Sequence, residues 1–67
     1  MSKFTDSYGN EVVEGSRIII ESNYNFQHIN GKEYKVIWDS KHGMYKYAEV
    51  DSKHGDNFYG IHKFKLI

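Results

Sequence analysis

Polar and apolar residues alternate along most of this chain, as they do in a β-strand with one buried face. In the stretch Glu33–Trp38, the side chains of Tyr34, Val36 and Trp38 share one face. Apolar residues almost never recur at the three- and four-residue spacing of an amphipathic helix. The sequence therefore predicts an all-β protein.

Five short segments show this alternation or are rich in β-branched residues, and turn residues separate them. Residues 21–31 read ESNYNFQHING, a composition typical of a long early loop. We expect a single 3-10 turn near the C-terminus, just before the last strand. The predicted strands are Arg17–Glu21, Glu33–Trp38, Met44–Val50, Asn57–Ile61 and the chain end from His62 to Ile67.

With 67 residues, the chain 1–67 is expected to form one domain with a thin core. A small, partly open barrel of five strands fits this length. An SH3-like barrel is favoured, and an OB-like barrel, which usually needs more residues, is the alternative. No cysteine is present, so aromatic rings must supply much of the packing. The predicted core is Val12, Ile18, Ile20, Tyr34, Val36, Trp38, Met44, Ala48, Val50, Phe58, Ile61, Phe64 and Leu66, with Trp38 only partly buried.

The pentapeptide DSKHG occurs twice, at residues 39–43 and 51–55. Each copy lies between two alternating segments, and Asp, Ser and Gly are turn residues. The repeat is therefore interpreted as two reverse turns. Successive turns of a meander lie at opposite ends of the sheet, so we expect the two copies not to build one site.

The charge balance bears on the class of partner. Nine Lys and Arg residues offset nine Asp and Glu residues, which argues against a general electrostatic attraction to nucleic acid or to an anionic membrane. No apolar run approaches the roughly 20 residues of a membrane span, and the N-terminus lacks the core of a signal peptide. We expect a soluble cytoplasmic protein with no membrane partner.

Catalysis and metal binding find little support in the residues. The four histidines lack the spacing of helix-borne zinc ligands, and there is no cysteine to assist them. Ser, His and Asp do occur together in DSKHG, but neighbouring residues of a tight turn point apart, and a catalytic Ser also needs an oxyanion hole. The sequence predicts a non-enzyme without metal or cofactor.

The candidate binding site is an aromatic and basic face. Tyr45 and Tyr47 point the same way with Lys46 between them, and Lys35 is expected near that face. Such rings suit a protein hot spot, and with cations they also suit single-stranded nucleic acid. The alternative is that the two tyrosines only stabilise the sheet as cross-strand pairs. The candidate residues are Tyr45, Tyr47, Lys46, Lys35, Lys41, Tyr24 and Phe26.

A host or phage protein is the favoured partner, because the net charge is zero, and weak binding of single-stranded nucleic acid is the alternative. A monomer is expected. Residues 63–67, KFKLI, are apolar at alternate positions and could form an edge strand. A dimer that pairs through this C-terminal strand is therefore the alternative to a monomer.

Two stretches resemble a known family. Residues 5–18, TDSYGNEVVEGSRI, resemble the D-x-x-G-x-E-[IV]-x-E-G-[DS]-x-[IV] segment of YopX-like proteins, which are small proteins of phages and prophages. Residues 34–39, YKVIWD, followed by Gly43-Met44-Tyr45, are similar to the next signature of that family. The resemblance implies a β-barrel, a phage or prophage origin and a place in the host cytoplasm. It carries over no catalytic residue.

Overall fold

The computed structural model describes residues 3–24 and 27–67 of the chain. Phe26, one of the candidate binding residues, lies outside the described residues. The described part contains five β-strands and one 3-10 helix. Their bounds are β1 Arg17–Asn23, η1 Gln27–Ile29, β2 Glu33–Asp39, β3 Met44–Ala48, β4 Gly55–Asn57 and β5 Ile61–Leu66.

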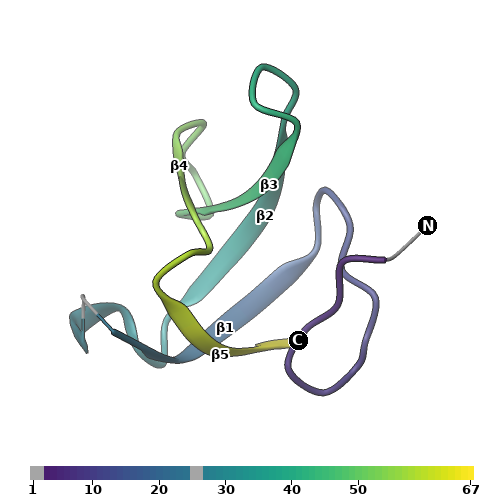
Figure 1. The fold of residues 1–67 in the computed structure, drawn as a ribbon. Helices are drawn as coiled ribbons and strands as arrows, with labels where there is room; N and C mark the ends of the chain where they lie inside the picture. The colour runs from purple at the N-terminus through teal and green to yellow at the C-terminus, as the bar shows by residue number, and fades with distance from the viewer. Residues whose placement is uncertain (1–2, 25–26) are drawn as a thin grey trace.

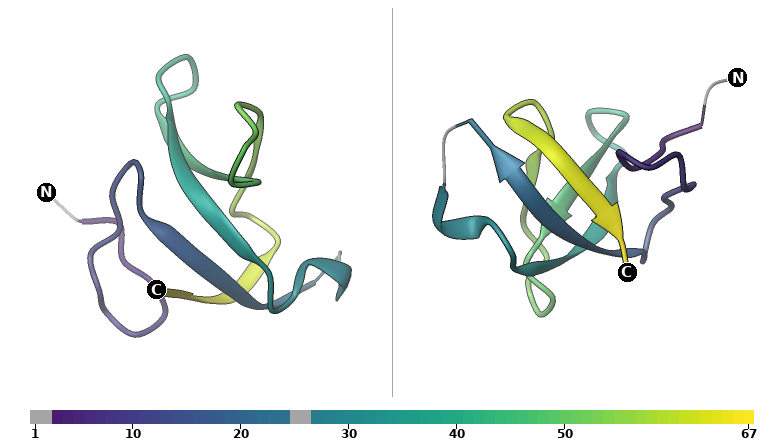
Figure 2. Two further views of the ribbon diagram at one scale, coloured as in Figure 1. Left: turned by 180° about the vertical axis from the view of Figure 1, so that it is seen from behind. Right: turned by 90° about the horizontal axis from the view of Figure 1, so that it is seen from below.

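The strands form one antiparallel sheet in the order β4-β3-β2-β1-β5, so the last strand pairs with the first (Figure 1). The sheet is strongly twisted, and seen from below, β1 and β5 lie side by side and cross the direction of β2 and β3 (Figure 2). Its two end strands, β4 and β5, are not hydrogen-bonded to each other. The prediction of an all-β, five-stranded small barrel is confirmed, and the barrel is partly open.

The predicted end of the fourth strand and the predicted place of the 3-10 turn, both near the C-terminus, are wrong. The fourth strand was expected at Asn57–Ile61 but ends at Asn57, and residues 58–60 form a turn closed by the Ile61 N–H bonding the Phe58 carbonyl at 3.0 Å. The Asn57 side chain accepts the Tyr59 N–H at 3.0 Å, which is the turn chemistry of asparagine. In the described residues, the 3-10 helix lies in the long loop after β1, not near the C-terminus.

The core lies between the two curled halves of the sheet. Seven of the predicted core residues are buried: Val12, Ile18, Ile20, Tyr34, Val36, Ala48 and Phe64. Ile29 of η1 and Tyr47 of β3 are buried as well, and the sequence reasoning missed both. Val50 is exposed, so its assignment to the core is wrong. Trp38, expected to be only partly buried, is 44% exposed, and Met44, Phe58, Ile61 and Leu66 are half-buried.

A turn at the N-terminus is fastened to β5 through Asp6, whose side chain is buried. One carboxylate oxygen accepts the N–H groups of Tyr8 at 2.9 Å and Asn10 at 2.8 Å, and the other accepts the Leu66 N–H at 2.8 Å. Ser7 adds two bonds to Phe64: its N–H donates to the Phe64 carbonyl and its Oγ accepts the Phe64 N–H, both at 3.0 Å. The turn therefore covers part of the outer edge of β5.

These contacts predict a dependence of stability on pH. Burial alone raises the pKa of Asp6, but the hydrogen bonds from Leu66, Asn10 and Tyr8 outweigh it and lower the pKa from 3.8 to about 2. Because the folded-state pKa lies below the unfolded value, ionised Asp6 stabilises the fold at neutral pH. That contribution is lost as the pH falls from about 4 toward 2.

Asp6→Asn is therefore expected to be less stable than the wild type at pH 7, and the difference should shrink as the pH falls from about 4 toward 2. Urea unfolding at a series of pH values measures both effects. Asp51→Asn, at an exposed acidic residue in the connection after β3, is the matched control and should follow the wild type. An Asp6→Asn midpoint equal to that of the wild type at pH 7 would contradict the role given to this carboxylate.

Candidate functional site

The two tyrosines at the centre of the predicted face point into the barrel. In the β2–β3 register, Tyr47 lies opposite Val36 and Tyr45 lies opposite Trp38, so all four share one face of the hairpin. Tyr47 is only 7% exposed, and its ring meets the ring of Tyr34 edge-on at 5.3 Å. Tyr45 is half-buried against the core. The expectation that both rings lie on an open outer face is wrong.

The predicted lysines lie on the opposite face of the same hairpin. Lys46 is opposite Ile37, and Lys35 is opposite Ala48, so the expected closeness of Lys35 to the tyrosine face is wrong. Lys41 is exposed in the β2–β3 turn. The structure thus places Tyr45 and Tyr47 on one side of the hairpin and Lys35 and Lys46 on the other.

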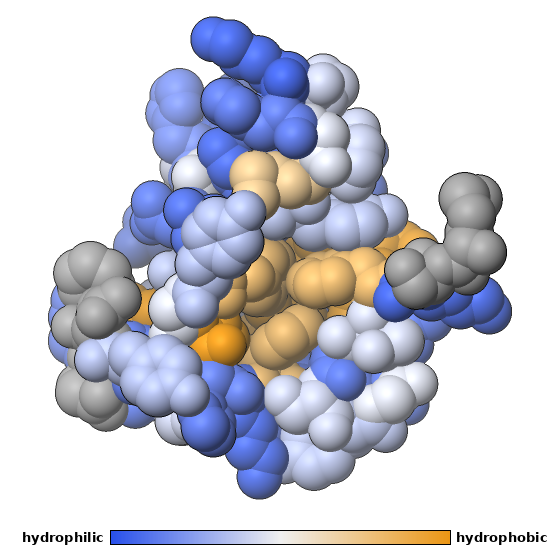
Figure 3. Space-filling model, viewed as in Figure 1, coloured by the Kyte–Doolittle hydropathy of each residue, from blue (hydrophilic) through white to orange (hydrophobic). Residues whose placement is uncertain are grey.

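The inner face is open to solvent over a cluster of aromatic rings. The ring of Phe4 stacks on Tyr45 at 5.0 Å and meets Phe58 edge-on at 5.1 Å, and Phe58 lies 5.0 Å from Phe64. Phe4, Tyr45 and Phe58 are only partly buried. Hydrophobic side chains gather in a hollow at the centre of this face (Figure 3). We call the three partly buried rings and the space above them the aromatic hollow.

Two exposed tyrosines lie on neighbouring segments near the start of β5. Tyr59 follows Phe58 directly and is 83% exposed, and Tyr24 is 69% exposed. The Tyr24 N–H donates to the Gly60 carbonyl at 2.9 Å, which joins the two segments. The Tyr24 hydroxyl lies 2.7 Å from Nδ1 of His62, so its ring is held in place. Tyr59 was missed because its segment was interpreted as a strand, although Asn57 and Gly60 flank it as turn residues.

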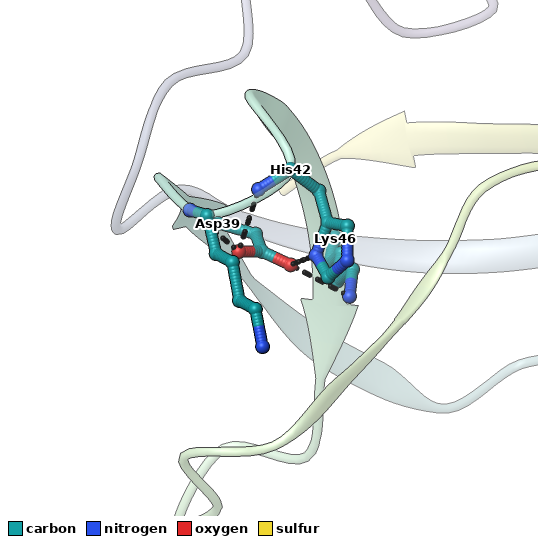
Figure 4. Close-up of polar contacts among 4 residues, drawn as sticks. Asp39, His42 and Lys46 are labelled. Atoms are coloured by element: carbon teal, nitrogen blue, oxygen red, sulfur yellow. Dashed lines mark hydrogen bonds and ion pairs between the residues drawn. The ribbon is translucent and has the colours of Figure 1, made fainter.

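The first DSKHG is a hairpin turn, as predicted. Asp39 Oδ1 accepts the N–H groups of Lys41 at 3.0 Å and His42 at 3.3 Å, and Gly43 takes a φ of +63°, which favours glycine. Asp39 Oδ2 lies 2.7 Å from both His42 Nδ1 and Lys46 Nζ (Figure 4). The hydrogen bonds from Lys46 and then His42 hold the pKa of Asp39 well below its usual range.

The second DSKHG has a different conformation. Its tight bend spans residues 49–52 and includes only the first two residues of the copy, since the Ser52 N–H donates to the Glu49 carbonyl at 2.9 Å. Gly55 already belongs to β4. The loop after β3 returns toward the first hairpin, and both loops project at the same end of the molecule (Figures 1 and 2). Residues of both copies line one pocket of about 330 Å³, so the expectation that they lie too far apart to share a site is wrong.

A second pocket, of about 360 Å³, lies beside the buried tyrosines and is lined in part by His28, Glu49 and Asp56. Burial, and then the charge of Glu49, raises the pKa of Tyr34, while burial followed by the charge of Asp56 raises the pKa of Tyr47. Both hydroxyls therefore stay protonated and can donate hydrogen bonds.

Within residues 3–24 and 27–67, nowhere do three or more His, Asp or Glu side chains gather so that they could hold a metal ion. In the same residues, no helix has the length and hydrophobicity needed to cross a membrane.

Comparisons of the chain with models of protein families, with curated proteins and with solved structures found no match.

Proposed function

We propose that this chain is a non-catalytic binding module that recognises a segment of another protein through the aromatic hollow and the adjacent tyrosines. The observation that carries the proposal is the cluster of partly buried rings Phe4, Tyr45 and Phe58 packed on the core, together with the hydrophobic hollow in the face that Figure 3 shows. Contiguous apolar surface of this kind marks interaction sites on small soluble domains.

The two exposed tyrosines support the same proposal. Tyrosine is enriched among the residues that dominate protein–protein binding energy, because its ring supplies large contact area with few rotatable bonds. The Tyr24 side chain is held by the hydrogen bond between its hydroxyl and His62 Nδ1, whereas Asn57 holds only the backbone N–H of Tyr59. Side chains that are already ordered lose less entropy when a partner binds.

The resemblance of residues 5–18 and 34–45 to YopX-like proteins supports a phage or prophage origin. On this proposal the partner is a host or phage protein, and the module acts in the host cytoplasm by occupying a surface of that partner. The balanced charge of the chain, with nine basic and nine acidic residues, favours a protein over nucleic acid as the ligand of the aromatic hollow.

The test compares wild-type protein, Tyr24→Ala/Tyr59→Ala and Tyr8→Ala as bait in bacterial lysate, with mass spectrometry of the captured proteins. We expect the double variant to retain the specific partner at least about tenfold less than the wild type does, as for the loss of hot-spot residues. Tyr8 is the matched control because its ring contacts Lys63 and its hydroxyl bonds Glu21, outside the hollow.

Equal capture by the double variant and the wild type would refute the role of this face. A wild type that retains nothing above blank resin would also count against the proposal. Circular dichroism of each variant shows whether the fold is intact before the capture is compared.

A further inference from the structure

The pocket of about 360 Å³ beside Tyr34 and Tyr47 is built on the inner face of the sheet, and we call it the tyrosine pocket. Tyr47 lies opposite Asp56 in the β3–β4 register and opposite Val36 in the β2–β3 register, so these side chains share one face. Tyr34 is two residues from Val36 and therefore lies on that face too. Three neighbouring strands thus direct Tyr34, Tyr47 and Asp56 to the same side.

The two tyrosine hydroxyls have no protein partner. Tyr34 is 4% exposed and Tyr47 is 7% exposed. In residues 3–24 and 27–67, neither hydroxyl makes a hydrogen bond, and every fully buried side-chain oxygen has a partner, so both hydroxyl oxygens reach solvent. Burial and then the charge of Glu49 raise the pKa of Tyr34, while burial and then the charge of Asp56 raise the pKa of Tyr47. Each hydroxyl therefore lies near a carboxylate that lines the tyrosine pocket.

The two carboxylates stand at the rim of the pocket. Glu49 directly follows β3, Asp56 belongs to β4, and both residues are exposed, whereas the buried tyrosines form the floor. Neither carboxylate forms an ion pair within the described part of the chain. The described residues that line the pocket include no Lys or Arg. The negative charge of the pocket is therefore uncompensated.

A guanidinium group matches these features better than other cations do. It is planar and carries five N–H donors in a fixed fork, so it can bond two carboxylates on different segments and the hydroxyl oxygens between them. An ammonium group offers three donors on a compact and strongly hydrated centre. A metal ion would need further ligands close to the carboxylates, and no three His, Asp or Glu side chains gather in that way among the described residues.

We propose that the tyrosine pocket binds the guanidinium group of an arginine side chain, with Glu49 and Asp56 as counter-charges and the hydroxyls of Tyr34 and Tyr47 as further acceptors. The pocket adjoins the aromatic hollow, because the ring of Tyr47 meets the ring of Phe58 edge-on at 5.4 Å. On the proposed function, which this inference needs only for the source of the arginine, the residue belongs to the protein segment that occupies the hollow.

An NMR titration of isotope-labelled protein tests the pocket without any partner. The ligand is arginine with its amino and carboxyl groups both blocked. At about 50 mM salt and about pH 7.5, where histidine is mostly neutral, we expect saturable shifts at Ala48, Glu49 and Asp56 with a dissociation constant of about 1–10 mM. Blocked citrulline, which has nearly the same shape without the charge, should give no saturable shifts. Blocked lysine should bind at least about threefold more weakly than blocked arginine.

The variant Glu49→Gln/Asp56→Asn should bind blocked arginine at least about tenfold more weakly than the wild type does. Glu11→Gln/Asp51→Asn removes the same charge at exposed residues that do not line the pocket, so it is the matched control and should bind almost as the wild type does. Equal losses in the two variants would overturn the proposal, since they would indicate a general attraction between charges.

The variant Tyr34→Phe/Tyr47→Phe keeps both rings and both carboxylates but removes the two hydroxyls. We expect it to bind blocked arginine about threefold more weakly or worse. The spread of amide signals in each variant's spectrum shows that the fold is intact before affinities are compared. Unchanged affinity in this variant would refute the site as proposed, because the hydroxyls are part of it.

Absence of saturable shifts in the wild type with blocked arginine would overturn the proposal outright. An equal response to citrulline would also refute it, and an equal affinity for lysine would rule out a site selective for guanidinium. The capture experiment on Tyr24 and Tyr59 uses neither these residues nor this ligand, so a failure here is distinguishable from a failure of the proposed function.

Discussion

Ile20→Ala is expected to lower the free energy of unfolding by about 2–4 kcal/mol. Ile20 lies in β1, the strand between β2 and β5, and it is fully buried. Removing its side chain beyond Cβ leaves a cavity in a core of few residues. A domain of this length has a total stability of roughly 3–10 kcal/mol, so the variant should be largely unfolded at moderate urea concentrations.

Ile19→Ala is the matched control for this experiment. It makes the same chemical change in the same strand, but the side chain of Ile19 lies on the other face and is only half-buried. Its expected loss is less than half of that at Ile20. Urea titrations followed by circular dichroism measure both losses, and a difference between the two variants smaller than about 0.5 kcal/mol would contradict the assigned inner face of β1.

Gly55→Ala is expected to cost about 1–3 kcal/mol through steric overlap. A Cβ at residue 55 would lie 2.7 Å from the Tyr47 carbonyl oxygen, 2.9 Å from Ile37 Cδ1 and 3.2 Å from Lys46 Cβ. The carbonyl belongs to the backbone of β3 and cannot rotate away, so β4 must shift. Because residues 53–55 line the pocket shared by the two DSKHG segments, NMR shifts should change there as well as in β4.

Ile37→Val supplies a direct check, since it removes the Cδ1 atom that the new methyl group would meet. Gly55→Ala should therefore cost less in the Ile37→Val background than in the wild type, a coupling that a double-mutant cycle measures. Gly43→Ala is the comparison for backbone strain alone: residue 43 has a φ of +63° and no atom near the added Cβ. Additive losses for Gly55→Ala and Ile37→Val would exclude a part for Ile37 Cδ1 in the overlap, and a Gly55→Ala variant as stable as the wild type would refute the steric explanation.

The strands could be predicted because their alternation is a local property. Tyr34 and Val36 point inward as the pattern of β2 predicts, and Ile18 and Ile20 do so in β1. In β3 the same pattern is ambiguous, because one face carries Tyr45 and Tyr47 and the other carries Lys46 and Ala48. The aliphatic side was predicted to face inward, but a chain with few aliphatic residues fills its core with rings, and Tyr47, which also lines a pocket, is buried.

The candidate site was harder to predict because it depends on loop lengths. The two DSKHG copies are identical in sequence, yet Gly43 ends a hairpin turn while Gly55 begins β4. The difference arises because β3 ends at Ala48, which lengthens the following connection and lets it fold back. No local pattern encodes that length.

The N-terminal turn also affects how this protein behaves when it is concentrated. An edge strand with free N–H groups can form backbone hydrogen bonds with a strand of another molecule. Repeated pairing of this kind leads to fibrils. On β5, the N–H groups of Phe64 and Leu66 are already bonded to Ser7 and Asp6. Proteolytic loss of the first ten residues would free these N–H groups, so protection from intermolecular β-pairing rests on a segment that belongs to none of the five strands.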